Sequence, residues 1–410
     1  MRALPHALLV GALAAMPATA ADWSLNGSVG QSFEANTNPG VEVDNDGATY
    51  GSITRLNLTL GAQTRRTSWA LSSGAAISQF GGPGATSDLN SPNPNASGAV
   101  RYRGQRLDLG ATANFSRQST SFIDFNTAAI IRAIEEEGDD FDGVVLLPED
   151  DLLIERESIR TLYSMGADAR YRLTPLTDLR VSGTGAITRF TEEVANLTPN
   201  SSFAFGINLD HGISSLSRIG LNTTIRRFTA DNAEDTRGLS VSFGGSYRTR
   251  LTPSTAVDLG LGAGFTRINE IGLGGLRETD TDVSFTGGLS GSYTPNADTG
   301  FRFSMSQAVR PSSDGDLVNV TSLGGILNYN LTRLSAFSVA ASHSISNEIG
   351  STGDDELDHS FIIGPTLSYR FAPDWTASLG YTFRFVTDDG DTAVGNRVFL
   401  GVTRSLAFFP

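Results

Sequence analysis

The sequence predicts an all-β fold, a transmembrane antiparallel up-and-down β-barrel of about 18 strands, with about 16 as the alternative count. Three observations predict it: apolar and polar residues alternate through many short runs, short turns alternate with long acidic loops, and aromatic residues gather at the ends of the runs. A water-soluble sandwich also alternates, but nothing in it requires all short turns at one end and all acidic loops at the other.

The alternation is clearest near the end of the chain, where residues 361–371 and 375–385 place Phe, Leu, Tyr and Trp on one face and Thr, Ser and Arg on the other. Period-two alternation is the signature of a strand with two different faces. The same pattern, bounded by turn residues, predicts the following strands: 23–33, 50–62, 69–77, 99–103, 107–115, 159–173, 179–187, 203–209, 219–228, 239–249, 257–265, 283–293, 301–309, 323–331, 337–345, 361–371, 375–385 and 398–408.

Connections between these strands fall into two kinds. Short turns, several containing proline, are expected at 63–68, 104–106, 174–178, 249–256, 294–298, 332–333 and 372–374. Longer and mostly acidic loops are expected at 34–47, 79–97, 117–157, 270–282, 346–358 and 387–396. Because the two kinds alternate, we predict short turns on the periplasmic side and long acidic loops on the extracellular side.

Aromatic residues support a membrane setting, because Trp and Tyr favour the two lipid interfaces. Trp and Tyr are expected near the short-turn ends: Trp23, Trp69, Tyr102, Tyr171, Tyr247, Tyr293, Tyr329, Tyr369 and Trp375. Phe residues are expected near the long-loop ends: Phe33, Phe115, Phe203, Phe228, Phe265, Phe285, Phe361 and Phe385. The two sets predict two aromatic girdles.

The N-terminus has the features of a secretory signal peptide: Arg2, an apolar stretch over 7–15 and the small-residue site Ala18-Thr19-Ala20. We therefore expect a signal peptide at 1–20 and one barrel domain at 21–410. The absence of cysteine excludes disulfides and thiolate chemistry. A formal net charge of −14 argues against nucleic acid as a partner.

The last fifteen residues, 396–410, form an aromatic closing strand in which Leu406 and Phe408 keep the alternation, although Arg404 interrupts it and Pro410 follows it. Through this end and the strand rhythm, the chain resembles Gram-negative outer-membrane β-barrel proteins, in particular porin-like families of loosely defined function. The resemblance implies location in the bacterial outer membrane. It also implies contact with outer-membrane lipid and lipopolysaccharide, and insertion by the barrel-assembly machinery.

Positions opposite the apolar set should point into the lumen, and many of them are arginines, with few acids beyond Asp108 and Asp168. Arg lining a pore lowers the barrier for small anions or binds an acidic glycan. The alternative is that these arginines pair with acids of loops folded inward. The predicted pore-lining residues are Arg55, Arg170, Arg172, Arg180, Arg218, Arg226, Arg248, Arg250, Arg302, Arg370 and Arg384.

The loop 117–157 differs from the others, because it contains an apolar run that predicts a short helix at 127–137, followed by acids. An apolar run in a loop needs cover, so the loop either folds inward as a constriction or contacts a partner or another subunit. The predicted constriction residues are Ile130, Ile131, Glu135, Glu136, Asp139, Asp140 and Asp142.

The predicted function is an outer-membrane porin-like channel for passive or weakly selective diffusion of small hydrophilic solutes, including anions. Two alternatives remain: an export channel for an anionic polysaccharide, and a structural or adhesive surface barrel with a plugged lumen. No enzyme is predicted, since His211, His343 and His359 fall in no nucleophile motif. No cofactor or metal is expected, because acidic clusters such as Asp388-Asp389-Gly390-Asp391 lack the spacing of a calcium loop.

Overall fold

The computed structural model describes residues 21–39, 41, 47–85, 88–119, 158–191, 197–232, 235–271, 277–311, 317–348, 358–388 and 391–409. The predicted signal peptide and the predicted constriction residues 130–142 lie outside this part of the chain. Within it, no helix combines the length and the apolar character needed to cross a bilayer.

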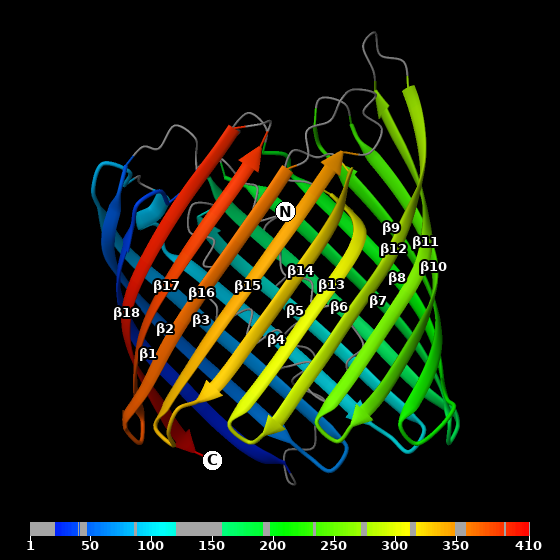
Figure 1. Cartoon of the computed structure of the whole chain (residues 1–410), viewed down its shortest axis with the longest axis horizontal. Coiled ribbons are helices and arrows are strands. Elements are labelled where there is room, and N and C mark those ends of the chain that lie inside the picture. The colour runs from blue at the N-terminus through cyan, green and yellow to red at the C-terminus, as the bar shows by residue number, and fades with distance from the viewer. Residues whose placement is uncertain are drawn as a thin grey trace.

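The described chain forms one 18-stranded antiparallel sheet that closes on itself, which confirms the predicted barrel and its strand count (Figure 1). A short 3-10 helix, η1 (Asp88–Asn90), lies between β3 and β4. The strands are β1 (Asp22–Asn36), β2 (Thr49–Gln63), β3 (Thr67–Gly81), β4 (Asn93–Arg103), β5 (Leu107–Ser119), β6 (Ile159–Thr174), β7 (Thr177–Phe190), β8 (Asn200–Gly212), β9 (Ser217–Ala230), β10 (Arg237–Thr252), β11 (Thr255–Ile271), β12 (Arg277–Asn296), β13 (Thr299–Pro311), β14 (Leu317–Asn330), β15 (Ser335–Glu348), β16 (Asp358–Ala372), β17 (Trp375–Asp388) and β18 (Asp391–Phe409).

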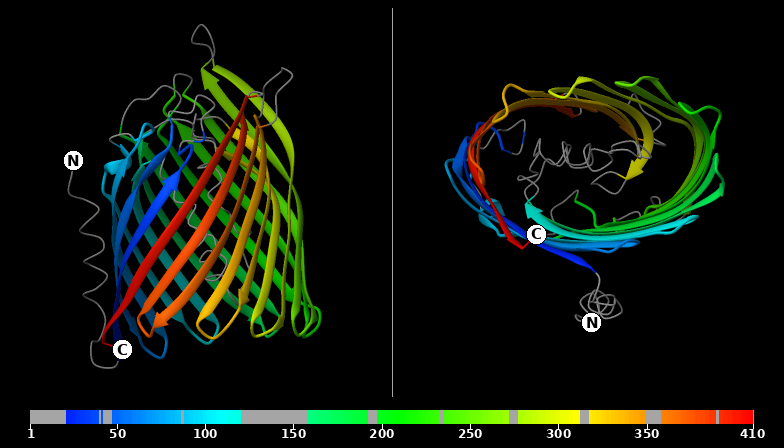
Figure 2. Two further views of the ribbon diagram at one scale, coloured as in Figure 1. Left: turned by 60° about the vertical axis from the view of Figure 1, so that its left-hand side comes forward. Right: turned by 90° about the horizontal axis from the view of Figure 1, so that it is seen from below.

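Each strand pairs with its neighbours in the chain, and β1 pairs with both β2 and β18. The β1–β18 pairing runs from Leu25↔Phe409 to Asn36↔Arg397 and closes the barrel. Viewed along its axis, the barrel is an oval ring of tilted strands (Figure 2). Closure satisfies the backbone hydrogen bonds that an open sheet edge would leave unpaired in lipid.

The outer face of the barrel is apolar. Large hydrophobic side chains on this face remain exposed, for example Phe33 at 62%, Phe243 at 62% and Leu400 at 53%. They alternate along each strand with small and polar residues, so one face of the whole sheet is apolar and the other is polar. An exposed apolar surface around a closed barrel is the surface of a protein that spans a membrane.

All short connections described lie at one end of the barrel, together with the last strand's end (Figure 1). The predicted Trp and Tyr residues lie near this end on the outer face, and nearly all of them are exposed. The three tryptophans make aromatic contacts across strands: Trp23 meets Trp69 edge-on with ring centroids 5.1 Å apart, and the Trp375 ring centroid lies 6.1 Å from that of Phe371. Rings that are apolar at one edge and polar at the other suit a lipid interface.

Two predicted long loops are shorter than expected. Residues 270–282 belong largely to the β11–β12 hairpin, which pairs as far as Ile271↔Arg277, and residues 387–396 belong largely to the β17–β18 hairpin, which pairs as far as Asp388↔Asp391. The prediction ended each strand where apolar alternation stopped. Backbone pairing does not require apolar side chains, so a ladder continues into polar sequence above the membrane.

The predicted position of Phe228 in the outer girdle is wrong. Phe228 is 1% exposed and lies on the inner face of β9, in an apolar cluster with Ala230, Ile268, Val309 and Leu317. Its strand position explains this, because Phe228 shares the parity of the inward Arg226 while the exposed Ile225 has the opposite parity. Outward and inward faces are set by parity and not by residue type.

The barrel wall is not paired evenly. In the described residues, β12 pairs with β13 only from Gly287↔Gln307 to Asn296↔Thr299, whereas β12 pairs with β11 up to Arg277 and β13 pairs with β14 up to Pro311. Above Gly287, the end of β13 turns inward from the ring of strands (Figure 2). The hairpin end formed by residues 308–311 and 317–320 is called the β13–β14 tip below.

Candidate solute path through the barrel

The inner wall consists of the residues that alternate with the exposed apolar ones. Along β10, for example, the exposed Phe243 and Tyr247 alternate with Gly244, Ser246 and Arg248. Inward positions on most strands carry hydroxyls, amides, charged groups or glycine. An 18-stranded barrel is wide enough for such a wall to enclose water, unlike an eight-stranded barrel that side chains fill.

All eleven arginines of the predicted set lie on strand positions opposite the exposed apolar residues. Eight of them lie toward the short-turn end of the barrel: Arg170, Arg172, Arg180, Arg218, Arg248, Arg250, Arg302 and Arg370. The remaining three, Arg55, Arg226 and Arg384, lie nearer the loop end of their strands. The arginines therefore form a tier near one mouth rather than an even lining.

Several arginines of this tier pair with acids of the wall itself. Asp178 accepts hydrogen bonds from Arg170 at 2.8 Å and from Arg218 at 3.3 Å. Arg172 lies 3.2 Å from Asp108. The Asp178 side chain is 11% exposed, so it is a largely buried carboxylate held between two arginines.

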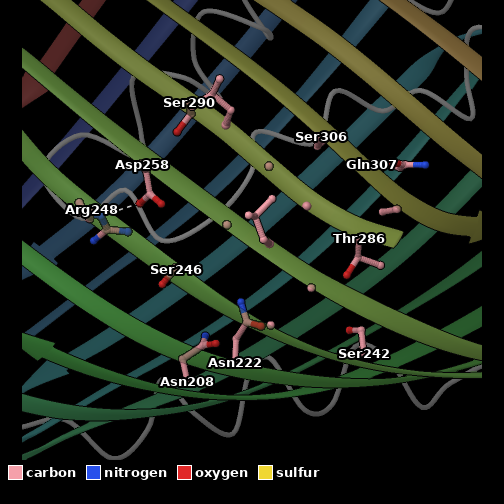
Figure 3. Close-up of a pocket in the computed structure, with 18 of the residues that line it drawn as sticks. Asn208, Asn222, Ser242, Ser246, Arg248, Asp258, Thr286, Ser290, Ser306 and Gln307 are labelled. Atoms are coloured by element: carbon pink, nitrogen blue, oxygen red, sulfur yellow. Dashed lines mark hydrogen bonds and ion pairs between the residues drawn. The ribbon is translucent and has the colours of Figure 1, made fainter. Parts of the chain in front are cut away.

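A second pair in the same tier joins adjacent strands. Arg248 of β10 donates through Nε to Asp258 of β11 at 2.7 Å (Figure 3). These two residues are in register, so the pair is a cross-strand contact on the lumen side.

A separate charged cluster lies higher in the barrel, at the closure between β1, β2 and β18. Glu34 is 7% exposed. Its carboxylate forms ion pairs with Arg397 Nη2 at 2.8 Å and with Arg55 Nη2 at 3.6 Å, and it accepts a hydrogen bond from the Ser32 hydroxyl at 3.0 Å. Arg55 also donates to Ser32 at 2.8 Å. One buried carboxylate thus holds two arginines from the strands on either side of it.

The sequence analysis missed the wall acids Glu34, Asp178 and Asp258, as well as Arg397. It placed Glu34 in a loop and Asp178 in a turn, where strand parity was not applied. Extending the alternation of each strand by two residues would have placed Glu34 and Asp178 on the inner face. Glu34 lies two residues after the inward Ser32, and Asp178 lies two residues before the inward Arg180. The alternative interpretation gave the inward arginines loop acids as partners, whereas Arg55 and Arg170 pair with the strand acids Glu34 and Asp178.

A cavity of about 270 Å³ opens on the lumen side of β8 to β13 (Figure 3). Its lining combines uncharged polar residues and glycine with some apolar residues and with the charged Asp210, Arg218, Arg248 and Asp258. Glycines make the wall hollow here: a Cβ at Gly244 would stand 2.5 Å from Asn222 Oδ1, and one at Gly262 would stand 2.9 Å from Thr286 Oγ1. The Asn222 amide and the Thr286 hydroxyl occupy the places that side chains at Gly244 and Gly262 would take. They therefore lie close to the backbone of the wall, which leaves space in the lumen for a small hydrophilic solute.

The histidines do not assemble a catalytic or metal site in the described chain. His211 lies in β8 and its Nδ1 is 3.0 Å from the Thr177 hydroxyl, whereas His343 and His359 stack at 5.9 Å on the outer face. Among the described residues, no group of three or more His, Cys, Asp or Glu could hold a metal ion.

No family model matches the sequence. No curated protein matches it either. Among solved structures of similar shape, three are outer-membrane barrels with coverage above nine-tenths of both chains. "Crystal structure of Acinetobacter baumannii OccAB4" has a TM-score of 0.48 at 10% identity and covers 95% of this chain and 100% of that chain.

"Crystal structure of a BenF-like porin from Pseudomonas fluorescens Pf-5" has a TM-score of 0.47 at 9% identity, with coverage of 94% and 99%. "Crystal Structure of Pseudomonas Aeruginosa OpdK with Vanillate" has a TM-score of 0.47 at 10% identity, also with coverage of 94% and 99%. Identities and TM-scores this low transfer no function, and the barrel fold of this chain is established by its own strand pairing.

Proposed function

We propose that this chain is a porin-like channel of the bacterial outer membrane that lets small hydrophilic solutes diffuse with weak selectivity. The observation that carries the proposal is the contrast between an apolar exterior and a polar, charge-bearing inner wall in a barrel of 18 strands. Barrels of this size leave an aqueous channel. Residues 1–20 would direct export, and the outer membrane is where bacterial barrels of this kind reside.

Weak anion preference follows from the inner wall. Arginines outnumber acids at the inward strand positions toward the short-turn mouth, although Asp108, Asp178 and Asp258 neutralise part of the charge there. The inward arginines are Arg55, Arg101, Arg103, Arg160, Arg170, Arg172, Arg180, Arg218, Arg226, Arg248, Arg250, Arg302, Arg370, Arg384 and Arg397. The inward acids whose side chains the structure describes are Asp22, Glu34, Asp108, Asp168, Asp178, Asp210, Asp258, Asp282, Asp358 and Asp391. Paired charges keep the wall wet and the remaining positive charge favours anions.

The loop 117–157 is proposed to narrow this channel, as its apolar run suggests. Deletion of residues 128–147 would then raise single-channel conductance. Unchanged conductance of the deleted form would favour a contact with a partner or subunit instead.

The test of the function is conductance of the purified, refolded protein in planar bilayers, with reversal potentials measured in a salt gradient. We expect ohmic channels with weak anion selectivity. Folded protein that never conducts would contradict the channel and favour a structural barrel, whereas clear cation selectivity would contradict the anion preference alone.

Two matched variants locate the selectivity. Arg250→Gln with Arg370→Gln removes two positive charges from the inner wall near the short-turn mouth, so selectivity should shift toward cations. Arg404→Gln removes one positive charge from the outer face, where Arg404 lies 5.4 Å from the Trp375 ring, and serves as the control for position. The outer variant should leave the reversal potential unchanged.

A further inference from the structure

The upper part of the wall between β12 and β13 lacks a strand ladder. Residues 279–286 of β12 pair with β11 on one side, but the described chain gives them no strand partner on the other. Exposed apolar side chains, Val283 at 72% and Phe285 at 55%, show that this stretch still has an outer face. A strand edge with free backbone groups is an unfavourable feature next to lipid.

The strand that would fill this place is folded inside the barrel. Val309 and Leu317 of the β13–β14 tip are 6% and 4% exposed, and they cluster with Phe228 of β9 and Ile268 of β11. The Val309 carbonyl accepts a hydrogen bond from Arg226 of β9. Gly238 of β10 makes room for the tip, since a Cβ there would lie 2.4 Å from Leu317 Cδ1.

The parity of the tip suits a second position. Val309 continues the outward series of Phe303 and Met305, so in a continuous wall Val309 would face lipid. Extending the β12–β13 register beyond Gly287↔Gln307 places Val309 opposite Phe285, another outward apolar residue. The same residues therefore fit the tucked cluster and the missing part of the wall.

We propose that the β13–β14 tip is a gate with two positions: tucked into the lumen, as in this structure, and paired with the upper edge of β12. In the tucked position the tip lies above the polar cavity, whose lining includes Gln307 and Ala308 at the base of the tip. In the paired position the tip completes the wall and widens the lumen above the cavity. The end of β15, which is paired with β14 as far as Val318↔Glu348, moves outward with the tip. The effect on conduction rests on the proposed channel function, whereas the two positions themselves do not.

The two positions are stabilised by different interactions. The tucked position covers the inward apolar residues Phe228, Ala230 and Ile268, which water in the lumen would otherwise contact. The paired position supplies the missing ladder to β12 and gives up this cover, while Val309 and Leu317 stay in apolar surroundings because they face lipid. Removing Phe228 should therefore shift the balance toward the paired position.

Cysteine pairs test the gate directly, because the chain contains no cysteine of its own. Gly238→Cys with Leu317→Cys should cross-link the tucked position. Phe285→Cys with Val309→Cys should cross-link only the paired position, since Phe285 is exposed outside while Val309 is buried inside in the tucked one. Tyr293→Cys with Phe301→Cys, a registered pair on the outer face below the break, is the matched control.

We expect oxidation to cross-link all three pairs, the Phe285/Val309 pair more slowly, and faster when Phe228→Ala is added. The tucked cross-link should lower mean conductance, the paired one should raise it, and reductant should reverse both effects. The control pair should cross-link without changing conductance.

The gate is overturned if the Phe285/Val309 pair never cross-links in protein that the control pair shows to be folded. It is also overturned if the tucked cross-link and its reduction leave conductance unchanged in a conducting channel. If no form conducts, the channel proposal fails, and cross-linking of the two pairs still decides whether the tip has two positions.

Discussion

Strand pairing is longer at the seam that joins the two ends of the chain than at a seam between consecutive strands. The seam between β1 and β18, which joins the far ends of the chain, is paired from Leu25↔Phe409 to Asn36↔Arg397. The seam between β12 and β13, which follow one another in the chain, stops at Gly287↔Gln307. Chain connectivity holds two strands close but does not pair them. Pairing depends on where the side chains of the strand ends are best accommodated.

The side chains explain the difference. At the β1–β18 seam, Glu34 binds Arg397 of β18 and Arg55 of β2, so inward charges join the three strands. At the β12–β13 seam, the end of β13 carries Val309 instead, which packs with the inward Phe228.

The first prediction concerns the closing strand. Leu400 lies on the outer face of β18, opposite Phe33 and Leu379, and a cation there faces lipid. Leu400→Arg should destabilise the folded barrel by up to about 4 kcal/mol, the cost near the bilayer midplane. The measurement is urea unfolding in lipid vesicles. Thr403→Arg on the inner face of the same strand is the control and should change stability little.

The second prediction concerns the other seam. Phe228→Ala should remove roughly 3 kcal/mol from the packing of the β13–β14 tip, which corresponds to about a hundredfold more frequent opening. Amide hydrogen exchange at Val309 and Leu317 should accelerate, while exchange in the β1–β18 ladder stays as before. Phe203→Ala, which removes an exposed ring from the outer face, should leave the tip unaffected. Equal acceleration at both seams would contradict a local role for Phe228.

The third prediction returns to the charged cluster at closure. Glu34→Gln leaves Arg55 and Arg397 without their carboxylate, and because both arginines keep some solvent contact, the cost should be about 2 kcal/mol rather than that of a fully buried pair. Asp235→Asn breaks the exposed pair with Arg237 and should cost under about 0.5 kcal/mol. Chemical denaturation of both variants measures the contrast. Equal midpoints would show that burial of Glu34 contributes nothing.

The smallest effects compare single hydroxyls. In the continuous wall, Ser344 and Ser360 are buried and hydrogen-bonded at 2.7 Å, so Ser344→Ala should cost about 1 kcal/mol by leaving Ser360 unpaired. Near the break, the buried Ser284 hydroxyl has no hydrogen-bond partner among the described residues, and Ser284→Ala should be neutral or slightly stabilising. Unfolding midpoints of the two variants should move in different directions or by clearly different amounts.

The fold could be predicted from the sequence because its cause is local. Alternation with period two, seen in residues 361–371 and 375–385, fixes which side chains face lipid, and the turn residues fix the strand count. Strand ends were less predictable. The β17–β18 hairpin extends to Asp388↔Asp391 through acidic sequence that looks like a loop, since pairing above the membrane no longer requires apolar residues.

The site was predictable only in part. Alternation along a strand was enough to place the inward arginines on the lumen side, because the face on which a side chain lies depends only on its position within its own strand. It did not reveal that Asp178 would bind both Arg170 and Arg218, which come from two different strands. The tucked tip was equally hidden, because Val309 has a regular outward parity and leaves the wall for contacts with residues distant in sequence.

The chain contains three tryptophans, and their positions have a practical consequence. Trp23, Trp69 and Trp375 belong to β1, β3 and β17, which flank the place where the first and last strands meet. Their intrinsic fluorescence therefore reports on closure of the barrel and on insertion of its short-turn end among the lipid headgroups. The same emission does not report on the β13–β14 tip, so a fluorescent dye attached to the tip, with a different emission wavelength, would follow its motion separately.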